Sequence, residues 1–489
     1  MAFRVLLVYP NLQMINLMPS NISILSACLK QKGYEVKLFD TTLYKMDDKS
    51  IDERRVDYLQ VRPFNLSQYG IEYKTTDVYD DFRKCVEEYR PNLISISIVE
   101  DTLPIALKLL EGVRDIPIPV VAGGVHVILN QKEVLAYEDI DMICTGEGEI
   151  ALPELCNSIN YGYGYSGIKN IDTKKVHTEM RPLVDINMLP YNDFTVFERE
   201  RFFRPMQGKV FRMIPIEIDR GCPYSCTFCA APHLRSYYYK ACKGKYYRIK
   251  NVDRIMEELR HQVEKYNAEY IYFTAETFLA IGDDRLHELA DAYERDIHLP
   301  FWCQTRVDTI TDERIAIIKK MGCDRVSIGI EHGNEYFRTH VLKKKFTNEQ
   351  ALEASIIMSR HGIPITVNNM IGFPGETREL AFDTIYLNRK LVADSINCFA
   401  FKPYHGTSLR EVAIKEGYLD PDVPVHSLVD ATLDMPQFPK EEINGILRTF
   451  PMYIKFPEER FDEIRIAEHD DEKYDDLAKE YRKVYWGIV

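Results

Sequence analysis

The feature of the sequence that most constrains its fold is an alternation of short apolar strands with helix-length segments, which occurs in two successive series. The strands of the first series are expected at Arg4 to Val8, Glu35 to Phe39, Asn92 to Ile98, Pro119 to Ala122 and Asp141 to Thr145. Such alternation predicts a parallel sheet with helices on both faces. Ligands of these sheets bind beyond the carboxyl ends of the strands.

The second series contains six strand–helix units. Its strands are expected at Phe211 to Ile218, Tyr270 to Thr274, Phe301 to Gln304, Arg325 to Ile330, Pro364 to Ile371 and Ser395 to Phe401. Six units indicate a partial barrel rather than a closed barrel of eight. By analogy with closed barrels, catalytic residues are expected at the carboxyl ends of these strands.

The two series divide the chain into four parts. We expect a Rossmann-like domain over residues 1–166, an interdomain linker over 167–210, a partial (β/α)6 barrel of the TIM type over 211–417 and a C-terminal helical domain over 418–489. The linker is expected because periodicity weakens there and prolines and mixed charges appear. The fold class is therefore α/β.

Composition limits the partners and the location of the protein. The formal net charge of -13 argues against general binding of nucleic acids, which needs a basic face. The basic run Lys343 to Lys345 is interpreted as a solvated turn, with a local patch for nucleic acid as the alternative. No window approaches the roughly 18 apolar residues of a membrane span, and the amino terminus lacks the features of a signal peptide. We therefore expect a cytoplasmic protein without a membrane span.

Eleven cysteines are present, and only Cys222, Cys226 and Cys229 cluster. Their spacing is C-x3-C-x2-C, directly after the first expected barrel strand. Three thiolates can hold three irons of a 4Fe-4S cubane and leave the fourth iron without a protein ligand. The alternative is a structural zinc site, which needs a fourth ligand such as His233.

This segment resembles the signature of the radical S-adenosylmethionine (SAM) superfamily, including the aromatic Phe228 before the last cysteine. The resemblance implies that SAM chelates the open iron of an oxygen-sensitive cluster. It implies further that one electron cleaves SAM to a 5'-deoxyadenosyl radical, which removes hydrogen from an unactivated carbon. The electron is expected from an external low-potential donor such as flavodoxin or ferredoxin.

Residues at later strand ends resemble the SAM contacts of the superfamily. Glu276 corresponds to the carboxylate that receives the SAM ammonium, and Arg306 is expected to neutralise a carboxylate of SAM or substrate, or to form a structural salt bridge. The full set expected to bind SAM is Phe228, Glu276, Arg306, Ser327, Glu331 and Asn369. One departure follows Glu331, where the usual serine is replaced by His332.

A Rossmann-like domain before such a barrel resembles the cobalamin-binding class of radical SAM enzymes. The resemblance implies cobalamin contacts at Ser97, Val99, Glu100, Gly123, Gly124, His126, Gly146 and Glu147. Cobalamin mutases bind cobalt through a histidine in the loop after the first strand. The corresponding loop here, from Asn11 to Ser20, contains no histidine, so an imidazole ligand from this loop is excluded.

These resemblances imply a cobalamin-dependent C-methyltransferase that uses a 5'-deoxyadenosyl radical and methylcobalamin. The substrate is expected to be an amino-acid residue in a protein or peptide, with a lipid or small metabolite as the alternative. A non-methylating enzyme of the same class, such as an oxidative cyclase or a ring contraction catalyst, is the main rival. A non-enzymatic iron–sulfur or cobalamin sensor is a further rival. No catalytic residue is assigned from the sequence.

Overall fold

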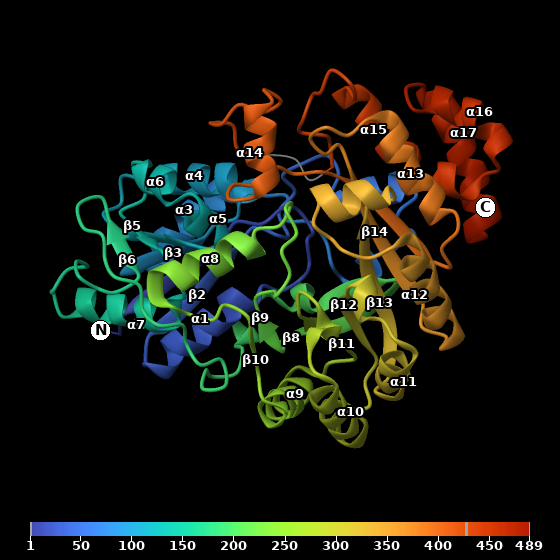
Figure 1. The fold of residues 1–489 in the computed structure, drawn as a ribbon. Helices are drawn as coiled ribbons and strands as arrows, with labels where there is room; N and C mark the ends of the chain where they lie inside the picture. Colours follow the sequence, from blue (N-terminus) through green and yellow to red (C-terminus); the bar gives the residue numbers. More distant parts are fainter. Residues whose placement is uncertain (1, 426–428, 489) are drawn as a thin grey trace. The chain divides into compact units, whose positions relative to one another are not determined.

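The computed structural model describes residues 2–425 and 429–488, which form two compact units (Figure 1). The first unit contains the described residues up to Ser50, Leu66–Arg204 and His233–Asn251. The second contains Ile51–Asn65, Pro205–Pro232 and the described residues from Val252 onward. The expected linear division at residues 166, 210 and 417 therefore differs from the observed one, because each unit is assembled from three stretches of chain.

The first unit is built on a six-stranded sheet of order β2-β1-β3-β4-β5-β6. Strands β1 to β5 pair in parallel, as expected from the alternation, and β6 is an antiparallel addition that was not expected. Its strands are β1 (Arg4–Tyr9), β2 (Glu35–Asp40), β3 (Leu93–Ser97), β4 (Val120–Gly123), β5 (Met142–Cys144) and β6 (Ile171–Thr173). The centre of β1 is buried at every position, which is typical of a strand covered on both faces.

Helices cover both faces of this sheet (Figure 1). Side chains of α3, α4, α5 and α6 form one core with β1, β3 and β4, while α1 packs against α7. The helices of the unit are α1 (Ser20–Gln31), α3 (Val78–Tyr89), α4 (Leu103–Glu111), α5 (Val125–Leu129), α6 (Gln131–Ala136), α7 (Gly148–Asn160) and most of α8 (Ala231–Cys242), with the short strand β10 (Arg248–Ile249).

The segment expected to be a linker packs on the first unit instead. Asp193 is buried and accepts hydrogen bonds from Ser26 Oγ and Lys30 Nζ of α1, both at 2.7 Å. Arg201 is also buried, and its guanidinium lies 3.3 Å from the carboxylate of Asp40 at the end of β2. Local composition could not indicate these partners, which lie more than 150 residues away in sequence.

The second unit contains a seven-stranded sheet of order β15-β14-β13-β12-β11-β8-β7. Strands β8 and β11 to β15 run parallel, and in the described residues β15 and β8 do not pair, so the sheet is a partial barrel as expected. The strands are β7 (Phe203–Met206), β8 (Lys209–Glu217), β11 (Tyr270–Thr274), β12 (Phe301–Thr305), β13 (Cys323–Glu331), β14 (Ile365–Ile371) and β15 (Ser395–Ala400), and β9 (Asp219–Arg220) follows β8.

Helices follow the barrel strands in turn and cover the outer face of the sheet (Figure 1). The helices of the unit are α2 (Ile51–Asp57), α9 (Val252–Tyr266), α10 (Asp283–Asp296), α11 (Asp312–Lys320), α12 (Asn348–Arg360), α13 (Arg378–Asn388), α14 (Ser408–Lys415), α15 (Lys440–Lys455), α16 (Phe461–Ala467) and α17 (Asp471–Tyr481). None of the helices in residues 2–425 and 429–488 is long and apolar enough to cross a membrane.

The free edge of the barrel at β15 is covered by the Ile51–Asn65 segment. Gln60 is buried, and its side-chain amide donates to the carbonyl of Cys398 at 3.0 Å and accepts from the Cys398 N–H at 3.4 Å. Unpaired edge strands are prone to non-native pairing. The amide of Gln60 therefore takes the place of a neighbouring strand at the centre of β15.

The C-terminal helices are fixed to the barrel by a buried ion pair. Arg378 of α13 donates to both carboxylate oxygens of Glu468 at 2.6 and 3.0 Å, and Tyr453 of α15 donates to the same carboxylate at 2.5 Å. A Cβ at Gly445 would lie 2.8 Å from the Cβ of Glu468. Glycine at this position thus allows α15 to approach the end of α16.

Candidate functional site

Cys222, Cys226 and Cys229 lie between β9 and α8, at the carboxyl end of the first barrel strand. None of the three cysteines is in a disulfide, and they lie close enough to interact electrostatically with one another. Burial is the main cause that raises the pKa of the Cys229 thiol to about 12, and Glu276 and the other two cysteines add to it. The structure therefore brings the three predicted ligands together.

The loop that carries these thiols, residues 221–230 and called the cysteine loop below, is held in place by hydrogen bonds of Thr227. Its N–H donates to the carbonyl of Leu342 at 3.1 Å, and its carbonyl accepts from the N–H of Leu409 at 3.2 Å. The Thr227 hydroxyl donates to the carbonyl of Val341 at 2.7 Å. These bonds fix the middle of the loop and thereby the directions of the cysteines around it.

Glu276 follows β11, and its side chain remains accessible to solvent. The surrounding protein removes part of its hydration and raises the pKa of its carboxyl group. Buried Asp219 lies near it, and burial together with Glu276 and Glu217 raises the pKa of Asp219 well above its usual value. Sequence reasoning missed Asp219, although an acidic residue directly after an apolar strand is a recognisable signal.

Arg306 lies at the carboxyl end of β12, in contact with the cysteine loop. Its guanidinium forms an ion pair with Asp308 at 2.8 Å and lies 3.8 Å from the centre of the Tyr224 ring. Its Nη1 is 3.5 Å from Cys226 Sγ. Of the two roles expected from the sequence, the structure contains the salt bridge, and it adds a contact with a cysteine ligand.

Ser327 and Glu331 of β13 both have partners within the protein. The Ser327 hydroxyl accepts a hydrogen bond from Trp302 Nε1 at 2.8 Å, and the Glu331 carboxylate pairs with Lys344 Nζ at 2.7 Å. Lys344 is only 5% exposed, so the interpretation of its run as a solvated turn is wrong at this residue. A Cβ at Gly329 would lie 2.1 Å from Glu331 Oε1, so any other residue here would force this ion pair to shift.

Asn369 is not brought to the other predicted SAM contacts. Its side chain is fully buried, and its amide nitrogen donates to Asn388 Oδ1 and to the carbonyl of Asn397, both at 3.1 Å. Side chains alternate along a strand, and in β14 the half-exposed positions are Thr366, Asn368 and Met370. Asn369 therefore points to the opposite face of β14.

His332 replaces the usual serine and supports the loop that follows β14. The Asn334 N–H donates to His332 Nδ1 at 3.0 Å, which places the proton on Nε2, and this Nε2–H donates to Glu376 at 3.0 Å. Glu376 in turn accepts from the backbone N–H groups of Gly372 and Phe373. The ring of Phe373 lies 6.3 Å from that of Phe228, so this loop packs on the cysteine loop.

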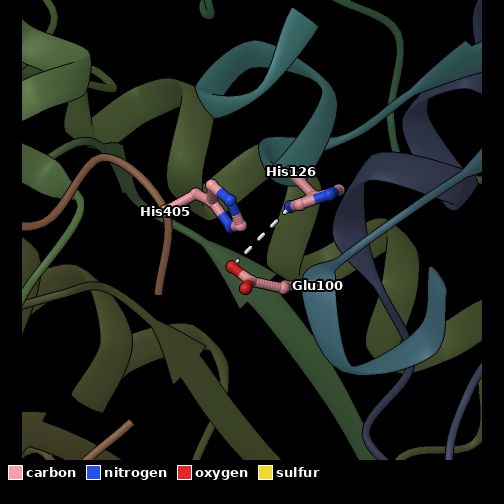
Figure 2. Close-up of side chains that lie close together, drawn as sticks. All are labelled: Glu100, His126 and His405. Atoms are coloured by element: carbon pink, nitrogen blue, oxygen red, sulfur yellow. Dashed lines mark ion pairs between the residues drawn. The ribbon is translucent and has the colours of Figure 1, made fainter. Parts of the chain in front are cut away.

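In the first unit, Ser97, Val99 and Glu100 lie at the carboxyl end of β3. The Ser97 hydroxyl accepts from Asn21 Nδ2 at 2.8 Å, while the Val99 side chain is 38% exposed. Glu100 and His126 are both buried with their side chains directed toward each other, and His126 Nδ1 lies 3.8 Å from the Glu100 carboxylate (Figure 2). The structure thus brings together predicted residues from the ends of β3 and β4.

The four residues Gly123, Gly124, Gly146 and Glu147 have different surroundings. A Cβ at Gly123 would meet only Cys144 Cβ at 3.8 Å, whereas one at Gly124 would lie 2.5 Å from the Ile98 carbonyl oxygen. A Cβ at Gly146 would lie 2.9 Å from Asn170 Nδ2. Bare backbone at Gly124 is therefore required by the protein itself, a Cβ at Gly146 would displace the Asn170 side chain, and Gly123 leaves space for another group.

Glu147 is engaged by the two later stretches of its unit. Its carboxylate pairs with Arg248 and accepts from the Val184 N–H at 2.8 Å. Nearby, the Tyr237 hydroxyl donates to the Thr145 carbonyl at 2.8 Å and accepts from Gln131 Nε2 at 2.7 Å. Sequence reasoning missed Arg248 and Tyr237, since they lie about 100 residues after their partners.

Two family models match the chain. The model of the radical SAM superfamily matches residues 216–385, and the model of the B12 binding domain matches residues 16–156. The chain therefore carries a radical SAM domain and, amino-terminal to it, a B12-binding domain. The two domains confirm the predicted fold class, and they support the predicted cofactors SAM, a 4Fe-4S cluster and cobalamin.

Individual relatives are distant. An uncharacterized methyltransferase of Pyrococcus horikoshii is 26% identical over 388 residues, which cover 77% of this chain and 81% of the relative. An anaerobic magnesium-protoporphyrin IX monomethyl ester cyclase of Rubrivivax gelatinosus is 23% identical over 349 residues, 68% of this chain and 60% of the cyclase. The solved structure of the radical SAM methyltransferase TsrM from Kitasatospora setae, with cobalamin and a [4Fe-4S] cluster bound, has a TM-score of 0.62 and 20% identity, and the match covers 91% of this chain and 82% of TsrM. This likeness shows a shared fold.

The donor atoms of the radical SAM enzyme fit these cofactors. The three thiols, none of them in a disulfide, suit a cubane with one open iron, and the Ala231 N–H lies 3.4 Å from Cys229 Sγ as a donor to that ligand. For cobalamin, Gly123 leaves space and Val99 presents apolar surface at the carboxyl end of the sheet. In the loop after β1, Asn11 and Gln13 are bonded to Thr42 and to the backbone N–H groups of Met46 and Asp47.

Proposed function

We propose that this radical SAM enzyme is a cobalamin-dependent methyltransferase that methylates an unactivated carbon. The observation that carries the proposal is the histidine-free loop from Asn11 to Ser20 within a B12-binding unit. The loop offers amide, thioether and hydroxyl groups, which are weaker ligands for cobalt than imidazole, and Asn11 and Gln13 are already hydrogen-bonded. A weak or absent donor favours repeated reduction of cobalt, which methyl transfer from SAM requires.

When bound, the cluster and SAM would supply a 5'-deoxyadenosyl radical for removal of hydrogen from carbon, and cobalamin would supply a methyl group that originates from a second SAM. The protein binds and orients the reactants. The accessible carboxylate of Glu276 is suited to receive the ammonium of SAM. The loop from Gly372 to Glu376, fixed by His332, is suited to position the adenine beside Phe228.

We propose an amino-acid residue in a protein or peptide as the substrate. TsrM has also been solved with tryptophan substrate bound, in a fold that covers 94% of this chain at 18% identity. The electron for SAM cleavage comes, in this proposal, from a low-potential donor such as flavodoxin or ferredoxin. Mass spectrometry of host proteins and metabolites with and without the gene tests the substrate class. A methyl-sized mass difference confined to lipids or small metabolites would refute it.

Anaerobic turnover with SAM and a chemical reductant tests the reaction type. Methylation requires S-adenosylhomocysteine to accumulate together with 5'-deoxyadenosine as substrate is converted. The relation to the cyclase of Rubrivivax gelatinosus makes a non-methylating reaction the second candidate. Conversion of substrate with 5'-deoxyadenosine but without S-adenosylhomocysteine would establish that candidate and exclude methylation.

A further inference from the structure

Arg306 is a buried arginine whose contacts all lie at the cysteine loop and its own strand end. It is 6% exposed, and it follows β12 at the start of a short 3-10 helix, Val307–Thr309. The Asp308 carboxylate holds one side of the guanidinium at 2.8 Å. The Tyr224 ring, from between the first two cysteines, lies 3.8 Å from the guanidinium carbon.

These two contacts aim the remaining N–H groups of Arg306 at a cluster ligand. Nη1 lies 3.5 Å from Cys226 Sγ, which is within hydrogen-bond distance for sulfur. Arginine stays protonated under all ordinary conditions, so this contact is charge-assisted once Cys226 binds iron as a thiolate. Cys229 differs, because its sulfur accepts from the uncharged backbone N–H of Ala231 at 3.4 Å.

We propose that Arg306 is a positioning residue that tunes the reduction potential of the cluster through Cys226, rather than a ligand for a carboxylate of SAM or substrate. Reduction adds one electron from the external donor to the cluster and moves no proton. The added negative charge is shared with the cysteine sulfurs, so a fixed guanidinium at Cys226 favours the reduced form. Hydrogen bonds to cluster sulfurs and local charge are known determinants of cluster potentials. The proposal rests on the superfamily assignment and is independent of whether the product is methylated.

The test is a redox titration of the reconstituted holoenzyme, followed by electron paramagnetic resonance of the reduced cluster. Arg306→Gln removes the charge, and we expect the ratio of reduced to oxidised cluster at a fixed potential to fall about tenfold, equivalent to a midpoint about 59 mV lower for one electron. The affinity for SAM should be unchanged. An unchanged midpoint at full iron content would overturn the proposal, as would a wild-type midpoint with weakened SAM binding.

Arg325→Gln is the matched control. Arg325 is also buried, at 2% exposure, but it lies near the start of β13 and donates hydrogen bonds to Thr366 and Asp394. Arg325→Gln also removes one buried positive charge, but at the end of β13 far from the cysteines. The midpoint potential of the cluster should therefore stay at the wild-type value. A shift as large as that of Arg306→Gln would show a general charge effect and overturn the specific contact.

The Tyr224 variants test the same contact with Arg306 retained. Tyr224→Phe keeps the ring under the guanidinium and removes only the hydroxyl that interacts with Arg306, so it should lower the midpoint less than Tyr224→Leu, which removes both. This pair decides the question if Arg306→Gln fails to incorporate iron. Equal midpoints for Tyr224→Phe and Tyr224→Leu would then refute the proposal.

Discussion

Replacing Gly124 by alanine should destabilise the first unit strongly. Gly124 has φ 103 and ψ 172, a region that is essentially restricted to glycine, and an added Cβ would lie 2.5 Å from the Ile98 carbonyl oxygen and 2.8 Å from its nitrogen. The backbone strain costs about 1–3 kcal/mol, and the steric overlap costs about 1–3 kcal/mol more. Both atoms of Ile98 belong to backbone, so a rotamer change cannot relieve the overlap.

Gly123→Ala is the informative comparison. An added Cβ there would meet only Cys144 Cβ at 3.8 Å, an ordinary contact, so stability should change by no more than about 0.5 kcal/mol. If this bare backbone admits cobalamin, as proposed, the same methyl group will intrude on the cofactor. We therefore expect Gly123→Ala to fold normally and to bind cobalamin more weakly.

Both tryptophans lie outside the first unit, so tryptophan fluorescence would not report its unfolding. Hydrogen exchange measured by mass spectrometry at the amides of β3 and β4 reports the stability of this unit directly. Equilibrium dialysis of the folded variants measures cobalamin affinity. Wild-type exchange in Gly124→Ala would refute the close approach to Ile98. Wild-type cobalamin affinity in Gly123→Ala would remove Gly123 from the proposed contacts.

Three further predictions concern the cofactors. Joint replacement by alanine of the cluster cysteines should abolish iron binding and SAM cleavage yet leave cobalamin binding intact, because the two sets of contacts lie in separate units; near-normal iron content would contradict the assignment. The pKa of Glu276 is raised, and SAM binding requires the carboxylate form of Glu276. SAM affinity should therefore fall as the pH decreases toward this raised pKa, at a higher pH than for an ordinary glutamate. Glu276→Gln should lose that dependence on pH. The Co(II) form should show no nitrogen superhyperfine splitting in its electron paramagnetic resonance spectrum; a triplet that disappears in His126→Ala would show an imidazole ligand.

The sequence alone predicted those features that depend on residues close together in the chain. The cysteine spacing needs only eight consecutive residues, and the expected strands of both series are observed within two residues of their predicted ends. The side chain of Asn369 illustrates a local error. A motif identifies the strand end but not which of two alternating positions faces the site, and the burial pattern of β14 assigns Asn369 to the opposite face.

Long-range pairs were not predictable. Lys344 resembles its exposed neighbours in sequence, and only the carboxylate of Glu331, brought beside it by the bulged end of β13, explains its burial. Likewise, nothing near Gln60 indicates that its amide bonds to the backbone of Cys398. Such partners are specified by the tertiary fold, so single-sequence patterns carry no information about them.

The interleaving of the two units has a consequence for how the chain acquires its structure. Domains commonly fold in order of synthesis, the amino-terminal one first. Here the first unit lacks Tyr237 and Arg248 until residue 251 has been made, and by then the cysteine loop of the second unit has already emerged. The segment with Gln60, made early, must in turn wait for β15. The two units are therefore expected to mature together, and a fragment cut at any single position would leave at least one of them incomplete.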